Sequence, residues 1–154
     1  MPHIHEKVDF TVEVFIVYKD KVLLRMHDKH KIWLSVGGHI ELDEDPIEAG
    51  IREVKEEVGL DVEIIGEKPP LEDEIDYKHL ISPRYLSTHY VKESHRHIVL
   101  IYFAKAFTDK VAEAKEEHER GESRWVSMEE LKEMDLRPNV LYYASEALKE
   151  LGEK

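Results

Sequence analysis

One acidic segment in the first half of the chain constrains the fold most, because it carries helix signals at both ends. Asp45 is a suitable N-cap, Pro46 suits the first helical position, and Glu48 completes a capping box three residues after the cap. Gly59 stands where a left-handed residue commonly ends a helix. We therefore predict a helix over residues 46–58.

The predicted helix has one apolar face and one acidic face. Apolar side chains recur at helical spacing at Ile47, Ile51, Val54 and Val58. Glu53, Glu56 and Glu57 stand at i, i+3 and i+4, so we expect their carboxylates to share the opposite face. Like charges at this spacing destabilise a helix by about 0.2 to 0.5 kcal/mol per pair, which a divalent cation would reverse. Oxygen ligands favour Mg²⁺ or Mn²⁺. A solvated acidic face is the alternative interpretation.

The rest of the chain mixes strands and helices without regular βαβ alternation, which predicts one α+β domain over residues 1–154. Apolar and β-branched runs predict strands over residues 10–18, 22–25, 60–65, 85–91, 97–107 and 124–126. A capping box at Ser127 and Glu130 predicts a short helix, and Pro138 opens a terminal helix that Gly152 ends. Residues 66–83 show no sustained hydrophobic periodicity, which predicts a long loop.

Composition excludes several classes of function. The chain has no cysteine, so disulfides, zinc fingers and thiol catalysis are excluded. A formal charge of −12 repels polymeric nucleic acid and anionic membranes, so we expect neither as a partner. The longest apolar run, Ile98 to Ala104, is too short to span a bilayer, and the polar N-terminus lacks a signal segment. We therefore expect a cytoplasmic protein.

Residues 38–60, GHIELDEDPIEAGIREVKEEVGL, contain a longer pattern around the predicted helix. It reads Gly, five residues, Glu, seven residues, Arg-Glu, an aliphatic residue, any residue, Glu-Glu, any residue, Gly and an aliphatic residue. The pattern resembles the signature of the Nudix hydrolases, matched by Gly38, Glu44, Arg52, Glu53, Val54, Glu56, Glu57, Gly59 and Leu60. Seven fixed residues at background frequencies of about 7% would coincide at about one site in 10⁸.

The resemblance implies a Nudix-like α/β/α sandwich with a mixed β-sheet, in which residues 38–60 form a loop, a helix and a loop. It implies a metal-dependent hydrolase that cleaves a pyrophosphate linkage in a nucleoside diphosphate-linked or nucleoside triphosphate substrate. The cofactor would be Mg²⁺ or Mn²⁺. Its ligands would be Gly37 or Gly38, through a carbonyl oxygen, and the box carboxylates of Glu53, Glu56 and Glu57.

The resemblance also implies roles for the residues around the metal. Arg52 would hold a box glutamate in place, with Glu44 as a candidate partner. The general base differs among family members, being either the box residue that matches Glu53 or an acid in a later loop. Among the acids before Trp125 we favour Glu119 by its position.

Histidines are candidates for a second chemistry. His95 and His97 form a His-x-His pair that a strand would place on one face, and His3 and His5 form another. Zinc is conceivable, but neither pair has a third nitrogen ligand at a recognisable spacing, so we favour surface or phosphate-contacting roles. His39 follows the box glycine, and we expect it either to reach the pyrophosphate or to pack outward.

The substrate is less constrained than the reaction. Asn139 falls about where family members that hydrolyse oxidised purine dNTPs carry a base-reading asparagine, although it could simply begin the last helix. Tyr77 lies where dinucleoside polyphosphate hydrolases of the family often have a tyrosine. The proline of many ADP-ribose hydrolases is missing at its usual spacing, since Pro69 and Pro70 come too early. An ADP-sugar nevertheless stays an alternative.

Two other classes of function compete with the enzyme. A non-catalytic nucleotide-binding module on the same fold is disfavoured because such proteins usually lose box carboxylates. A protein-interaction domain with an acidic face would bind no cation on the helix. For the enzyme we expect a small-molecule nucleotide as the partner. A homodimer is compatible with the resemblance, because dimers are common in the family.

Overall fold

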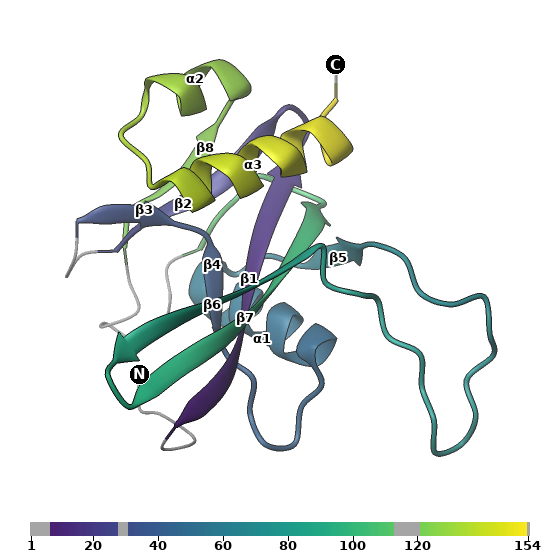
Figure 1. The fold of residues 1–154 in the computed structure, drawn as a ribbon. Helices are drawn as coiled ribbons and strands as arrows, with labels where there is room; N and C mark the ends of the chain where they lie inside the picture. The colour runs from purple at the N-terminus through teal and green to yellow at the C-terminus, as the bar shows by residue number, and fades with distance from the viewer. Residues whose placement is uncertain (1–6, 28–30, 113–120, 154) are drawn as a thin grey trace.

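The computed structural model describes residues 7–27, 31–112 and 121–153, and this part of the chain forms one mixed β-sheet with three helices (Figure 1). The strands are β1 (Val8–Tyr18), β2 (Lys21–His27), β3 (Ile32–Leu34), β4 (Val36–His39), β5 (Val62–Ile65), β6 (Tyr85–Lys92), β7 (His95–Ala106) and β8 (Ser123–Val126). The helices are α1 (Pro46–Val58), α2 (Met128–Glu133) and α3 (Pro138–Leu151).

Strand β1 lies at the centre of the sheet. It pairs antiparallel with β2 and β4 and parallel with β7, in the order β3-β2-β1-β7-β5. Strand β6 pairs with β7, and β8 pairs with β2. The short apolar segment before the two glycines forms β3 and the start of β4, and β4 then runs through both glycines to His39.

The two faces of the sheet carry separate hydrophobic cores, because side chains alternate along each strand. Phe15 and Val17 of β1 pack with α2 and α3, whereas Val14 and Ile16 pack with α1. Figure 1 shows α3 across one face of the sheet and α1 beneath the other. The predicted α/β/α sandwich is therefore confirmed.

The long loop predicted after β5 is also confirmed. Residues 66–84 contain no helix or strand apart from one isolated bridge between Glu74 and Tyr77. In Figure 1 this segment extends away from the sheet. Within the described ranges, no helix has the length and apolar character needed to cross a bilayer.

Candidate active site

Helix α1 carries the candidate site, and its own residues fix both of its ends. The Asp45 carboxylate accepts a hydrogen bond from the Glu48 amide at 2.8 Å, and the Glu48 carboxylate accepts one from the Asp45 amide at 3.0 Å. Gly59 ends the helix at φ 67°, a left-handed conformation that is readily open to glycine. The predicted capping box and C-terminal glycine are therefore confirmed.

The three box glutamates differ strongly in burial. Glu53 is only 2% exposed and the side chain of Glu57 11%, whereas the side chain of Glu56 is 50% exposed. The acids therefore form a gradient from the buried side of α1 to solvent. A charged carboxylate is stable in such a buried position only with cations or hydrogen-bond donors beside it.

The prediction that Ile51 belongs to the buried apolar face was wrong, because Ile51 is 43% exposed. Ala49 and Gly50 face the sheet in its place, next to Glu53. Their small size lets α1 approach the sheet closely on this side. The helix is thus rotated so that Glu53 lies on the inner face, which the apolar periodicity alone did not predict.

Two glycines let β4 pack closely, Gly38 against the box carboxylates and Gly37 against β1. A Cβ atom at Gly38 would lie 2.5 Å from the Glu53 Cδ atom, so any larger residue would displace the carboxylate. A Cβ atom at Gly37 would overlap the carbonyl oxygen of Val12. The Gly37 amide also donates to Glu57 Oε2 at 3.4 Å. The backbone of β4 therefore lies directly against the acids of α1.

Arg52 holds the acids in a fixed arrangement. Its guanidinium binds both oxygens of Glu44, from Nε to Oε2 at 2.6 Å and from Nη2 to Oε1 at 2.9 Å. It also donates to Glu53 Oε1 at 2.9 Å and to Glu56 Oε2 at 3.2 Å. The hydrogen bonds from Arg52 hold the pKa of Glu44 below its usual value. A further bond joins Arg52 Nη2 to the carbonyl oxygen of His39 at 3.1 Å.

Arg25 is a site residue that the sequence analysis missed. Its Nη1 donates to Glu57 Oε2 at 3.1 Å, and both side chains are largely buried. Arg25 comes from β2, 32 positions earlier in the chain, so no local pattern connects the two residues. The signal was the alternation of β2, since Leu23 packs on the α1 side and Arg25 follows two residues later.

The acidic cluster fits a divalent cation. Carboxylate oxygens are the ligands that hard ions prefer. Each carboxylate has two oxygens, so it can accept a hydrogen bond from an arginine and bind a cation at the same time. The absence of a side chain at Gly38 lets the backbone of β4 lie against the Glu53 carboxylate. Glu53, Glu56 and Glu57 together with this backbone are therefore a suitable oxygen-ligand set.

A cavity of about 780 Å³ lies on the face of the sheet that α3 covers, and it reaches β4 at Gly37 and Gly38. Its volume is in the usual range for small-molecule sites. Asn139 and Tyr143 of α3 line the wall, together with Arg137 just before the helix. Strands β1, β4, β6 and β7 supply much of the rest. The position of the cavity suits a ligand that extends from α3 toward the box.

Glu13 is a second residue that the sequence analysis missed. It lines the cavity from β1, pairs with Gly37 in the sheet and accepts a hydrogen bond from Ser35 Oγ at 3.3 Å. Burial raises the pKa of Glu13, although the Ser35 hydrogen bond opposes this effect. The signal was an acid between the apolar residues Val12 and Val14 of β1.

The predicted substrate residues lie in different places. Asn139 lines the cavity at the start of α3, so its placement agrees with both interpretations of this residue. His39 also lines the cavity, and its Nε2 lies 3.0 Å from Asp9 Oδ2. Tyr77 is 62% exposed in the long loop and is outside the cavity lining. Glu119 lies outside the described residues.

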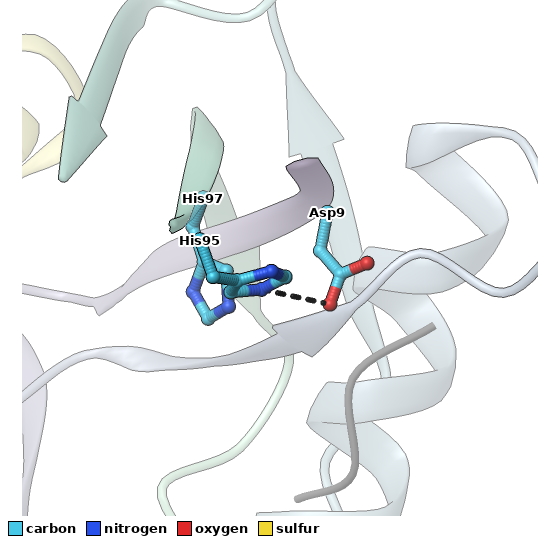
Figure 2. A group of neighbouring side chains, drawn as sticks. All are labelled: Asp9, His95 and His97. Carbon is cyan, nitrogen blue, oxygen red and sulfur yellow. Dashed lines mark ion pairs between the residues drawn. The ribbon is translucent and has the colours of Figure 1, made fainter. Parts of the chain in front are cut away.

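Histidines gather at one end of the cavity. His95 is 1% exposed, and its Nε2 lies 3.4 Å from the buried carboxylate of Asp9 (Figure 2). The rings of His39 and His89 each lie 5.0 Å from the ring of His97. The prediction of a surface role was wrong for His95, because strand pairing brings imidazoles together from β4, β6 and β7.

Known proteins resemble this chain in sequence and structure. The NUDIX domain family model matches residues 9–144. A NUDIX family hydrolase from Clostridium perfringens is 39% identical, covers 93% of this chain and 97% of its own, and superposes with a TM-score of 0.79. A MutT NUDIX hydrolase from Burkholderia pseudomallei shares the fold at 19% identity over 95% of this chain and 99% of its own, with a TM-score of 0.65. No curated protein gave a significant match.

These findings agree with the complete box and with the sandwich fold. Nudix hydrolases cleave pyrophosphate linkages in small nucleotide substrates and generally use a divalent metal ion. The family model covers most of the chain, and a solved relative shares more than a third of its residues. The chain therefore belongs to the Nudix hydrolase family.

Proposed function

We propose that Glu53, Glu56 and Glu57 hold Mg²⁺ or Mn²⁺, with a carbonyl oxygen of Gly37 or Gly38, and that the substrate is a purine nucleoside triphosphate. The observation that carries the proposal is the contact between the box and β4. The cavity reaches the same two glycines that lie against the carboxylates. A nucleotide whose base lies beside α3 would thus direct its phosphates toward the acids.

Several residues of this chain would act on the phosphates and on the attacking water. When bound, the metal ion makes water easier to deprotonate and neutralises phosphoryl charge. Glu53 would accept the proton of the attacking water, with Glu119 as the alternative base. Arg52 would hold Glu53 in place, and Arg25 would do the same for Glu57. Both arginines already bind these acids through hydrogen bonds of 2.9 and 3.1 Å.

The base would be recognised at the α3 end of the cavity. The side-chain amide of Asn139 can both donate to and accept from a purine edge. Glu13 offers a carboxyl group on the same cavity wall, and its raised pKa favours the protonated form, which can also donate and accept. Tyr90 and Tyr143 supply aromatic rings nearby. This combination favours a purine, including an oxidised purine dNTP.

An activity screen tests this proposal. We would measure phosphate or pyrophosphate release from normal and oxidised dNTPs, ADP-sugars and dinucleoside polyphosphates, each with Mg²⁺ and with Mn²⁺. We expect the highest kcat/KM for a purine dNTP. Hydrolysis of ADP-sugars alone would overturn the substrate assignment, and saturable binding without turnover would favour a non-catalytic module.

Two variants test the roles of individual residues. Glu57→Gln should lower kcat by at least about 100-fold, because it removes a charged ligand while keeping the side-chain shape. Asn139→Ala should lower kcat/KM for purine substrates by about tenfold or more, a loss typical of a base-reading hydrogen bond. Lys149→Ala, an exposed change on the same helix, is the matched control and should leave both constants unchanged. Full activity of Glu57→Gln would refute the metal assignment.

A further inference from the structure

We propose that Asp9, His95 and His97 form a second metal site that binds Zn²⁺ and is separate from the box carboxylates. One ligand atom of each residue lies within 4.8 Å of the ligand atoms of the other two. Asp9 and His95 are buried, and His97 is half-buried. Figure 2 shows the His95 ring directed at the Asp9 carboxylate, with the His97 ring beside it.

Strand pairing, and not local sequence, places these ligands together. The parallel pairing of β1 and β7 sets Asp9 opposite His97, and His95 lies two residues earlier on the same face of β7. The antiparallel pairing of β6 and β7 sets His89 opposite His97. Side chains at these positions therefore point to one side of the sheet.

The distance between Asp9 and His95 suits a shared ion. Their closest oxygen and nitrogen atoms are 3.4 Å apart. Charge-assisted hydrogen bonds are usually shorter, at about 2.7 to 2.9 Å. Two ligands on one tetrahedral Zn²⁺, each at about 2.0 to 2.1 Å from the ion, are separated by about 3.3 to 3.4 Å. A zinc ion would therefore fit between these atoms with little movement.

The ligand chemistry differs from that of the box. Two imidazoles and one carboxylate suit Zn²⁺, whereas an all-oxygen set suits Mg²⁺ or Mn²⁺. The carboxylate of Asp9 is fully buried, an environment in which a bound cation or hydrogen-bond donors stabilise its charge. The Nε2 atom of His39 lies 3.0 Å from Asp9 Oδ2, so a third imidazole contacts the same carboxylate.

The site would tie the sheet to the box. The carbonyl oxygen of His39 accepts a hydrogen bond from Arg52, and the side chain of His39 contacts Asp9. An ion on Asp9, His95 and His97 would thus fix β1 against β7 beside the end of β4. This inference does not depend on the hydrolytic reaction, because its test measures metal binding alone.

Zinc binding to the full-length, tag-free chain tests the proposal. After chelator treatment, we would titrate Zn²⁺ by calorimetry in millimolar Mg²⁺, which occupies oxygen sites. We expect one zinc ion per chain with a Kd of about 1 μM or lower. The double variant H95Q/H97Q should weaken binding at least about 100-fold. An unchanged affinity in this variant, or no zinc binding by the unaltered chain, would overturn the proposal.

Two control variants separate this site from other ligands. E56Q/E57Q removes two box carboxylates and should leave the zinc affinity unchanged. H3Q/H5Q removes the other His-x-His pair and should do the same. A loss of zinc binding in either control that matches the loss in H95Q/H97Q would contradict the assignment.

A measurement on the unaltered chain covers the case in which H95Q/H97Q does not fold. X-ray absorption at the zinc edge should show imidazole scattering from at least two histidines and short bonds of about 2.0 to 2.1 Å. A shell of oxygen ligands without imidazole would overturn the proposal. The single variant H97Q, at the half-buried ligand, should reduce this imidazole signal.

Discussion

Gly38 on β4 and Glu53 on α1 are packed so closely that a Cβ atom at residue 38 would lie 2.5 Å from the Glu53 Cδ atom. Because Glu53 is buried, its carboxylate has little room to move away. We predict that Gly38→Ala lowers kcat about 100-fold, since small displacements of catalytic groups have effects of this size. Steady-state nucleotide hydrolysis with saturating Mn²⁺ measures the change.

Gly50→Ala is the matched control for this prediction. It lies on the inner face of α1, but its Cβ atom would approach the flexible end of Ile64 at 3.3 Å and not a carboxylate. Alanine also favours the helix by about 1 kcal/mol relative to glycine. Similar losses of kcat in both variants would mean that Gly38 acts through general packing and not through Glu53.

The contact between Arg25 and Glu57 predicts that Arg25 strengthens metal binding at Glu57. Arg25→Gln removes the cation that orients the Glu57 carboxylate, so the Mn²⁺ concentration needed for half-maximal activity should rise about tenfold. Arg124→Gln breaks an exposed ion pair with Glu130 and should change neither metal dependence nor kcat. A shift in kcat/KM for the nucleotide without a shift in metal dependence would contradict this role.

The ion pair between Arg52 and Glu44 predicts a contribution to folding stability that is present at neutral pH and lost at low pH. The pKa of Glu44 is lowered in the folded state, so the pair stabilises the fold above the unfolded pKa of about 4.3. This contribution is lost as the pH falls through the folded pKa. We predict that Glu44→Gln costs about 1 kcal/mol of unfolding free energy at pH 7, and that the difference nearly vanishes at low pH.

Urea denaturation of both proteins at several pH values measures this difference. Glu130→Gln, in the capping box of the short helix α2, is the control. The pKa of Glu130 is also lowered, mainly by its hydrogen bond from the Ser127 backbone. It should reproduce the pH trend without affecting hydrolysis. A difference for Glu44→Gln that persists below the folded pKa would show that the pair acts through shape and not through charge.

The half-buried Glu13 should show the opposite pH dependence of stability. Its pKa is raised in the folded state, so its contribution to stability is complete below the unfolded pKa and is lost as the pH rises through the folded pKa. Glutamine keeps the shape without the charge. Glu13→Gln should therefore stabilise the protein at pH 8 by about 1 kcal/mol, with a smaller gain at pH 4. Equal changes at both pH values would contradict the assignment.

Local sequence signals were sufficient for much of the fold. The helix α1, its cap at Asp45 and its end at Gly59 follow from side chains within a few residues of each other. The strand at the centre of the sheet follows from its β-branched and aromatic content. Such features depend on neighbours in the chain, which a single sequence contains.

Contacts between distant segments could not be read in this way. The box pattern identifies Glu57, but not the arginine from β2 that binds it. The His-x-His spacing identifies His95, but not the carboxylate of Asp9 that strand pairing brings beside it. Register between strands sets both contacts, and the inward rotation of Glu53 depends on how α1 packs on the sheet.

The proposed active site requires a divalent ion on the box carboxylates, beside the cavity. Crystals grown in Mn²⁺ and measured near the manganese absorption edge test it most directly. We predict an anomalous peak within about 2.3 Å of carboxylate oxygens of Glu53, Glu56 and Glu57. Crystals of Mn²⁺-activated enzyme with no peak at these three residues would contradict the account.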